Sequence, residues 1–350
     1  MTKAAELAKM GEVLTNSQIG GRRNIVINGA MQVAQRATSE TGLGADGNTY
    51  NTCDRWHLSC ANTAGRFTMS QAADVHDGFA NALKFECTTA DTSIAAGEFV
   101  ILTQRFEGQD VQQFKKGSSD AESITVSFYV KGNASATYAL ELFDNDNSRQ
   151  ASQLFSVTTN WTRVIKTFTP DTTGAFDDDN ATSLELNIFL HAGSNLTSGT
   201  LSSTFASSTN ANRAAGISSF FDSTDRTFFI TGVQLEVGSQ ATPFEHRSFG
   251  EELALCQRYY EKTDTLRYHL VGRYNNDSGV PISTWLYKQT MRAAPAFSTS
   301  GSFTSTTGWG GTPLAISLAT DHAAIYSSTS VGANQQLWIN GGNIIFDAEL

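Results

Sequence analysis

Strand-forming segments follow one another from residue 24 to about residue 244, and this succession limits the fold more than any other feature of the sequence. Each segment is short and rich in β-branched and aromatic residues, which favour the pleated surface of a sheet. The expected strands are residues 82–89, 98–107, 123–132, 136–144, 161–170, 183–193 and 226–238. Loop-forming sequences separate them, so the pattern predicts an all-β fold built as an antiparallel β-sandwich.

Residues 123–132 show most clearly which side of a strand faces the core. The apolar side chains are Ile124, Val126, Phe128 and Val130, and the side chains between them are Thr125, Ser127 and Tyr129. An alternation with a period of two is typical of a strand with one buried face. Tyr129 is therefore expected on the outer, polar face of its sheet.

The sequence divides into an N-terminal segment (residues 1–23), the sandwich (24–247), a linker helix (248–263) and a small C-terminal β domain (264–350). In the N-terminal segment, Leu7, Met10 and Leu14 have helical spacing. Two interpretations remain open for this segment: a helix that frays at the terminus, or a docking helix that a partner or sister subunit orders.

Residues 248–263 carry the signals of a helix. Ser248 and Glu251 have the spacing of a capping box, and the first turn is acidic while the last turn is basic. We expect a helix of about three and a half turns. In the domain that follows, Asn340-Gly341-Gly342 lies between two apolar runs and predicts a hairpin turn.

Charge and composition exclude several classes of protein. The net charge is −10 and no run of Lys or Arg occurs, so phosphate contacts to nucleic acid are not expected. No apolar stretch is long enough to span a bilayer, and the first residues lack the apolar block of a secretory signal. We therefore expect a protein made in the cytoplasm without membrane insertion. Four cysteines in 350 residues predict free, buried thiols and not a disulfide framework.

Two patterns suggest a cofactor or a metal, and neither has the context that such a site needs. Residues 42–47 match G-x-G-x-x-G, but a strand-like segment follows where the dinucleotide motif requires a helix. On an extended strand, Cys53 and His57 share one face, while Trp56 and Cys60 share the other, so these residues and Cys87 do not converge on zinc. We expect Trp56 and Cys60 in the core, a local contact of Asp54 with Arg55, and neither a metal nor a cofactor.

Catalytic groups are equally sparse. The sequence contains no G-x-S-x-G elbow, and it singles out no pair of carboxylates for sugar hydrolysis. We therefore expect a protein that is not an enzyme. Sugar binding would need exposed aromatic side chains, for which Tyr129, Trp285 and Trp309 are the candidates. Each of these is also explained by packing, so the sequence leaves the ligand-binding residues unknown.

The segment "NIVINGAMQ" (24–32), taken alone, predicts a two-residue hairpin at Asn28-Gly29. Together with "ITVSFYVKG" (124–132), "WTRVIKTFT" (161–169) and "FFITGVQLEVG" (228–238), it resembles the strands of jelly-roll carbohydrate-binding modules, in the same order. The resemblance implies a jelly roll in which the first and last of these segments share one sandwich.

The resemblance also implies a structural calcium site, from which this sequence departs. The positions that match the family's acidic ligands hold Gln32 and Thr231-Gly232, which are poor ligands for a hard cation. The acidic loops Asp144-Asn145-Asp146 and Asp177-Asp178-Asp179 offer carboxylates elsewhere. Calcium binding and solvated turns are both open for these loops, and we predict no calcium at the family's position.

Longer segments resemble tail-fibre and virion structural proteins of tailed bacteriophages. These are "RNIVINGAMQVAQR" (23–36), "DRWHLS" (54–59), "ITGVQLEVGSQATPFEHRSFGEELALCQRYYEK" (230–262) and "MRAAPAF" (291–297). The resemblance implies a virion protein assembled in the host cytoplasm, a homotrimeric tail-fibre or spike subunit with other virion proteins as partners. Its role would be attachment to a host-surface glycan or fibre assembly. The alternatives are a head decoration protein and a polysaccharide-degrading tailspike.

Overall fold

A computed structural model describes residues 3–4, 23–263, 268–270, 282–305, 313–327 and 337–350 of the chain. The expected helix within residues 1–23 lies almost wholly outside the described residues. The chain forms two compact units, Met1–Phe249 and Gly250–Leu350. Among the described residues, no helix combines the length and the apolar character needed to cross a membrane.

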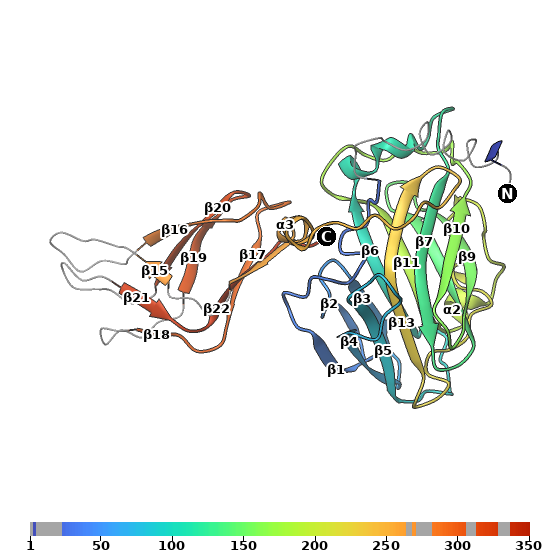
Figure 1. The fold of residues 1–350 in the computed structure, drawn as a ribbon, viewed down its shortest axis with the longest axis horizontal. Coiled ribbons are helices and arrows are strands. Elements are labelled where there is room, and N and C mark those ends of the chain that lie inside the picture. The colour runs from blue at the N-terminus through green and yellow to red at the C-terminus, as the bar shows by residue number, and fades with distance from the viewer. Residues whose placement is uncertain (1–2, 5–22, 264–267, 271–281, 306–312, 328–336) are drawn as a thin grey trace. The chain divides into compact units, whose positions relative to one another are not determined.

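The first unit is an antiparallel jelly-roll sandwich of two sheets that lie face to face (Figure 1). The six-stranded sheet has the order β1 (Ser39–Leu43), β4 (Arg66–Ala72), β5 (Ala82–Thr89), β13 (Thr227–Val237), β7 (Ile124–Gly132) and β10 (Thr162–Phe168). The seven-stranded sheet has the order β12 (Ala206–Ser207), β9 (Arg149–Val157), β8 (Ala136–Asp144), β11 (Thr182–Ala192), β6 (Phe99–Glu107), β3 (His57–Ala61) and β2 (Gly47–Tyr50). The short helices are η1 (Gly108–Asp110), η2 (Gln112–Phe114), α2 (Ser194–Thr197) and η3 (Asn210–Asn212).

The core lies between the two sheets and confirms the predicted alternation. Ile124, Val126, Phe128 and Val130 of β7 are all buried in it. The facing sheet contributes the alternate side chains of β8 and β11, among them Tyr138, Leu140 and Leu186. Because both sheets present one apolar side, burial of these side chains holds the layers together.

Residues 24–32, which we call the opening segment, lie along β13, the last strand of the sandwich and therefore its closing strand. The jelly-roll interpretation requires this arrangement. The Ile25 N–H donates to the Leu235 carbonyl at 3.0 Å, and the Val233 N–H donates to the Gly29 carbonyl at 2.9 Å. The predicted hairpin is nevertheless wrong, because residues 23–34 form no regular strand. A single tight turn, closed from Met31 N–H to the carbonyl of residue 28 at 3.1 Å, replaces it.

Asn28 is fully buried and serves as a hydrogen-bonding hub. Its amide donates to two backbone carbonyl oxygens at 2.8 and 2.9 Å, and its Oδ1 accepts from the Val33 N–H at 2.9 Å. The Trp56 indole N–H donates to the Asn28 carbonyl at 3.0 Å. Gly29 lies so close to β13 that a Cβ atom would come within 2.1 Å of the Val233 oxygen. The pair therefore joins the opening segment to the closing strand.

The second unit begins with α3 (Phe249–Gln257), which ends six residues before the predicted end of the linker helix. Residues 260–262 instead form strand β14, which pairs with β22. Three-stranded sheets follow with the orders β14-β22-β17, β15-β21-β18 and β16-β20-β19. Their strands are β14 (Tyr260–Lys262), β15 (Tyr268–Leu270), β16 (Ile282–Leu286), β17 (Ala296–Ser300), β18 (Thr304–Ser305), β19 (Pro313–Leu318), β20 (His322–Ser327), β21 (Leu337–Asn340) and β22 (Asn343–Asp347).

The predicted hairpin at Asn340-Gly341-Gly342 is also wrong in its pairing. Both glycines have positive φ angles, 78° and 63°, so the chain does turn sharply there. The strands on either side, however, belong to two different sheets. The turn thus carries the chain from one sheet to the next.

Candidate aromatic binding site

The outer face of the six-stranded sheet carries a group of aromatic side chains, which we call the aromatic patch. Its members are His76, Phe79, Tyr129, Trp161, Phe229, Phe244 and His246. Tyr129 lies there because its neighbours in β7 point into the core, as the alternation predicts. Phe229 comes from the adjacent β13, where it pairs with Lys131 of β7.

Gly232 creates the space in which two of these rings lie. It has a φ angle of +61° and lies at a bulge, where the register of β13 with β7 shifts between Thr231 and Gln234. A Cβ atom at this position would come within 2.6 Å of Phe79 Cζ and 3.0 Å of Tyr129 Cδ2. Glycine adopts the positive φ angle without steric cost, and its lack of a Cβ atom leaves room for both rings. The position expected to lack a calcium ligand thus supports two aromatic rings.

The rings of the aromatic patch form one connected set, in which Phe79 links Tyr129 to Phe244 and His246. His76 stacks on Tyr129 with a centroid distance of 4.2 Å and an interplanar angle of 22°. Phe79 lies 5.1 Å from Phe244 and 5.2 Å from His246, again between ring centroids. The Thr231 hydroxyl donates to the Asn81 carbonyl at 2.7 Å, which fastens the β4–β5 loop, with His76 and Phe79, to β13.

Basic side chains lie over several of the rings. The Lys131 ammonium is 5.5 Å from the Trp161 ring centroid and 5.1 Å from that of Phe229, and the Arg163 guanidinium is 5.9 Å from that of Tyr129. These distances allow cation–π attraction. Lys131 also forms an ion pair with Asp74 at 2.7 Å. The site therefore offers aromatic, cationic and carboxylate groups together.

The aromatic patch retains contact with solvent. Phe229 is buried, Tyr129 and Trp161 are half-buried, and His246 is exposed. Aromatic rings with polar neighbours at a partly exposed surface bind sugars, because the apolar C–H face of a pyranose stacks on a ring while its hydroxyl groups form hydrogen bonds. The aromatic patch therefore combines the kinds of side chain that sugar binding uses.

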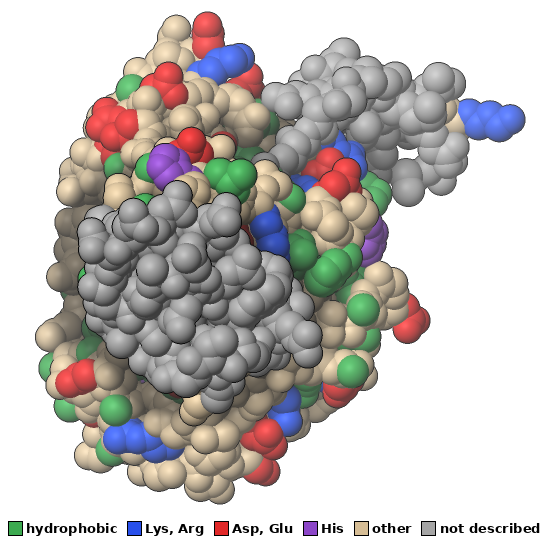
Figure 2. Space-filling view, turned by 90° about the vertical axis from the view of Figure 1, so that its left-hand side faces the viewer, with side chains coloured by type: hydrophobic (Ala, Val, Ile, Leu, Met, Phe, Trp, Pro, Cys, Tyr) green, Lys and Arg blue, Asp and Glu red, His purple; other side chains and the backbone are tan. Residues whose placement is uncertain are grey.

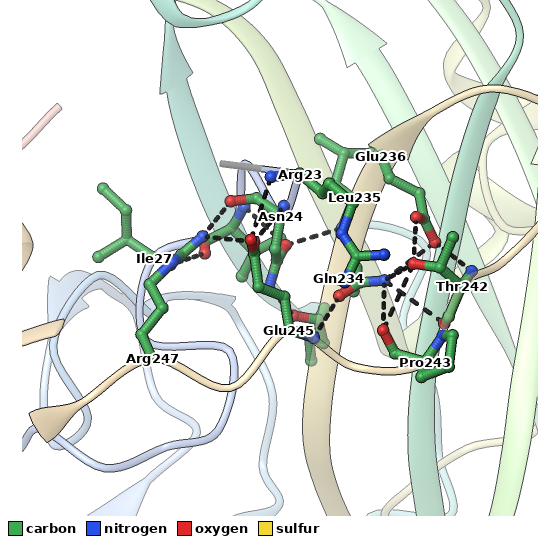
Figure 3. Close-up of polar contacts among 12 residues, drawn as sticks. Arg23, Asn24, Ile27, Gln234, Leu235, Glu236, Thr242, Pro243, Glu245 and Arg247 are labelled. Carbon is green, nitrogen blue, oxygen red and sulfur yellow. Dashed lines mark hydrogen bonds and ion pairs between the residues drawn. The ribbon is translucent and has the colours of Figure 1, made fainter. Parts of the chain in front are cut away.

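A network of hydrogen bonds holds the segment that carries Phe244 and His246 (Figure 3). We call it the closing network; its members are Arg23, Asn24, Gln234, Glu236, Thr242, Glu245 and Arg247. The Glu245 carboxylate accepts from the Asn24 N–H at 2.7 Å. Arg247 donates to the carbonyl oxygens of Asn24 and Val26. The chain thereby leaves the sandwich beside the point at which it enters.

The outward side chains of β13 complete the closing network. The Glu236 carboxylate accepts from the Thr242 N–H at 2.9 Å and from its hydroxyl at 2.7 Å. Gln234 donates to the same hydroxyl at 3.0 Å and accepts from the Glu245 N–H at 2.8 Å. The segment "VQLEVGSQATPFEH" thus folds back over its own strand, which places Phe244 against Phe79.

Of the three aromatic candidates from the sequence, Tyr129 alone lies in the aromatic patch. Trp285 lies in the second unit, where it packs against the hydrophobic cluster and donates to the Glu261 carboxylate at 3.3 Å. Trp309 lies outside the described residues. Sequence reasoning missed the other members of the patch. Phe229 had a usable signal, since it lies on the outer face of an alternating strand, whereas the members from loops had none.

The four cysteines lie in buried positions. Cys53, Cys60, Cys87 and Cys256 are free and buried, as predicted, and Trp56 is in the core. Cys53 also lies in the core with Trp56 and Cys60, although it was predicted to share the opposite face with His57, because residues 52–55 turn before β3 begins. Burial raises the pKa of the Cys60 thiol to about 12. Within the described ranges, no group of three His, Cys, Asp or Glu side chains is placed to hold a metal.

The glycine-rich sequence of residues 42–47 forms the end of β1, a turn and the start of β2. The predicted local contact of Asp54 with Arg55 stays a prediction, and both residues have other partners around the turn. Asp54 accepts from the Gln35 N–H at 3.0 Å, and Arg55 donates to the Arg105 carbonyl at 2.7 Å. Asp177, Asp178 and Asp179 are exposed, whereas Asp144 is fully buried.

The outer face of the seven-stranded sheet carries a second group of polar residues, which we call the charged strip: Arg105, Glu141, Glu185, Asn187 and Arg213. Glu141 is fully buried and accepts from Arg213 at 2.9 and 2.6 Å. The Asn187 amide bridges the two carboxylates, at 3.0 Å from Glu141 and 3.3 Å from Glu185. A glycosidase needs one carboxyl group that donates a proton. Both carboxylates here are instead engaged by arginines.

Basic side chains are interspersed with acidic, hydrophobic and uncharged ones among the described residues on the face shown in Figure 2. Among the described residues visible in this view, the basic side chains do not form the cluster that binding to a nucleic-acid backbone needs.

No family model matches the sequence. No curated protein matches it. Solved structures similar to this chain include one described as CBM4, with 12% identity, 60% of this chain and 97% of that chain covered, and a TM-score of 0.30. TmCBM61 in complex with β-1,4-galactotriose has 12% identity, covers 62% and 99% of the two chains, and has a TM-score of 0.32.

A further similar structure is the enzymatically active domain of tailspike protein 4 from bacteriophage CBA120. Its identity is 12%, 61% of this chain and 21% of that chain are covered, and the TM-score is 0.32. These likenesses describe the path of the chain and not the residues of a binding site.

Proposed function

We propose that this chain is a subunit of a tailed-bacteriophage fibre or spike, and that its sandwich binds a host-surface glycan through the aromatic patch. The aromatic patch is the observation that carries the proposal. It presents Tyr129 and Trp161 half-exposed on a rigid sheet, beside the Lys131 ammonium and the Asp74 carboxylate. Stacking surfaces with adjacent charged groups suit a ligand that has both apolar faces and many hydroxyl groups.

The virion part of the proposal rests on the sequence. The segment of residues 230–262, which resembles phage virion proteins, contains most of β13, five of the seven members of the closing network and α3. The closing network brings the entry and exit of the chain together, which suits a module inserted between an attachment segment and a distal unit. We propose a homotrimer without catalytic activity, with other virion proteins as partners.

The glycan part is tested by incubating the full chain with a printed array of bacterial surface oligosaccharides and polysaccharides. The expected result is saturable binding to one structural class of glycan, without a fall in polymer viscosity. A fall in viscosity would favour the tailspike hydrolase. An array with no bound glycan would contradict the adhesion role.

The virion part needs a separate experiment. Gold-labelled antibodies against the chain should decorate the tail of purified particles, and the mass of the purified protein should correspond to three copies. Label on the head would favour a capsid decoration protein. A monomer with no label on any particle would contradict the virion role.

A further inference from the structure

A lysine ammonium is enclosed by oxygen atoms at one corner of the sandwich. Lys116 follows η2, and its side chain is only 2% exposed. Its Nζ lies 2.5 Å from Asp144 Oδ2 and 3.1 Å from Asp171 Oδ2. It also donates to the carbonyl oxygens of Thr173 and Gly174, at 2.8 Å each. Three N–H groups thus face two carboxylates and two backbone carbonyls, a set of ligands typical of a bound cation.

Other residues build this corner around the ammonium. Arg149 forms a bidentate pair with Asp171 at 2.8 and 2.9 Å, and the Asn147 amide donates to Asp144 at 3.0 Å. Burial alone would raise the pKa of Asp171, but the hydrogen bonds from Arg149 and Lys116, with the charge of Lys116, together hold this pKa below its usual range. The oxygen atoms are therefore positioned by the fold as well as by the lysine.

Two glycines, Gly117 and Gly174, allow the loops around the Lys116 ammonium to approach one another closely. Gly117 has a φ angle of +83°, and a Cβ atom there would lie 2.5 Å from the Ala175 nitrogen. Gly174 has a φ angle of +70°, and a Cβ atom there would lie 2.3 Å from the Asn147 side chain. These close approaches bring residues 117, 147 and 174–175 against one another.

We propose that this corner is a cation site whose cation is the covalently tethered ammonium of Lys116. When the side chain is shortened, the same four oxygen atoms form a site for a free monovalent cation of the ammonium type. The proposal is independent of the glycan-binding role.

Charge and distance together select the class of cation. Lys116 and Arg149 carry two positive charges, and Asp144 and Asp171 two negative ones, so the corner is neutral. Loss of the lysine leaves one negative charge, which a monovalent cation balances and a divalent cation over-compensates. Calcium–oxygen distances are about 2.3–2.6 Å. Three of the four Nζ–oxygen distances here are 2.8–3.1 Å, which suits a larger cation.

The test is thermal unfolding of the full chain carrying Lys116→Ala. The variant leaves a buried carboxylate unpaired, so its Tm should fall by about 10 °C. Methylammonium chloride at about 100 mM should restore about 4 °C of this loss relative to tetramethylammonium chloride, which has no N–H group and controls for ionic strength. The wild type should not distinguish the two salts.

Two further variants make the result specific. Lys115→Ala removes the neighbouring lysine, which forms an exposed pair with Glu122 at 3.0 Å, and should behave as the wild type. The double variant Lys116→Ala with Asp144→Asn needs no cation for neutrality, and should lose the methylammonium response. If Lys116→Ala does not fold alone, the same comparison is made on its refolding yield, which methylammonium should raise.

Equal effects of the two salts on Lys116→Ala, in Tm and in refolding yield, would overturn the proposal. A larger stabilisation by calcium chloride than by methylammonium would overturn the assignment to a monovalent cation.

Discussion

The two outer faces of the sandwich use polar residues in opposite ways. On the seven-stranded sheet, the charged strip is closed, by which we mean that its charged groups pair with one another and are largely shielded from solvent. Glu141 is fully buried, and the Arg213 guanidinium lies 4.7 and 5.4 Å from the ring centroids of Phe143 and Phe189. On the six-stranded sheet, the aromatic patch leaves Tyr129 and Trp161 in partial contact with solvent. On the first face, the acidic and basic side chains of the charged strip pair with one another, whereas the second face keeps partly exposed rings that a ligand can contact.

The two faces are therefore expected to contribute to different properties, one to stability and the other to ligand binding. A buried ion pair contributes little when intact, but it is costly to break, because the remaining charge stays buried without a partner. Half-exposed aromatic rings add less to stability and retain area that a ligand can cover. Substitutions on the charged strip should therefore change the free energy of unfolding, and those on the aromatic patch should change glycan binding.

The largest loss of stability is expected from Glu141→Ala. It removes both acceptors of the bidentate Arg213 pair and the acceptor of the Asn187 amide. We expect the free energy of unfolding to fall by about 3–5 kcal/mol in urea titrations. Glu185→Ala, at a half-buried position, is the control and should cost less than half as much. Equal losses for the two variants would mean that the strip is not closed as described.

Gly232→Ala should lower both stability and binding. The positive φ angle costs about 1–2 kcal/mol for alanine, and displacement of Phe79 and Tyr129 adds about 1–2 kcal/mol more. Gly42→Ala is the matched control, since its φ angle is +76° but a Cβ atom would meet nothing within 4 Å. Urea unfolding should show the larger loss for Gly232→Ala. Weaker glycan binding is expected for Gly232→Ala alone, and an equal effect on binding from Gly42→Ala would refute the role of the ring contacts.

His57, on the closed face, should make stability depend on pH. Burial, and then the nearby Arg105, lower its pKa from 6.5 to about 3. Between these values the unfolded chain binds a proton that the folded chain does not, so stability falls as pH falls below 6.5. At pH 5 the loss is about 2 kcal/mol, from about 1.4 kcal/mol per pH unit.

The measurement is the change in free energy of unfolding between pH 7.5 and pH 5 for the wild type and for His57→Gln. His191, whose pKa is also lowered by burial, contributes equally to both proteins and cancels. The wild type should lose about 2 kcal/mol more than the variant. The same loss in both proteins would show that His57 titrates normally in the folded state.

The sequence predicted those parts of the fold that depend on local periodicity. The expected strands 82–89 and 136–144 coincide with β5 and β8, because one buried face per sheet produces a period of two. The same period correctly placed Tyr129 on the outer face. The fold class and the contact between the opening segment and β13 were also correct.

The remaining features depend on contacts between distant parts of the chain. Asn28-Gly29 has the composition of a hairpin, yet Gly29 is needed for its approach to Val233. Residues 260–262 continue a helical pattern, yet pairing with β22 makes them a strand. Lys115 and Lys116 are adjacent and chemically identical, yet only the second is enclosed by oxygen atoms from residues 144 and 171–174. No local pattern contains this information.

The central claim is that the aromatic patch, and not the charged strip, binds the glycan. The most direct test compares the dissociation constants of Trp161→Ala and Phe143→Ala, one ring from each outer face, for the glycan that the full chain selects on the array. Loss of a stacking ring should weaken binding by Trp161→Ala at least about tenfold, whereas Phe143→Ala should bind as the wild type does. Unchanged binding by Trp161→Ala, or an equal loss in Phe143→Ala, would contradict the account.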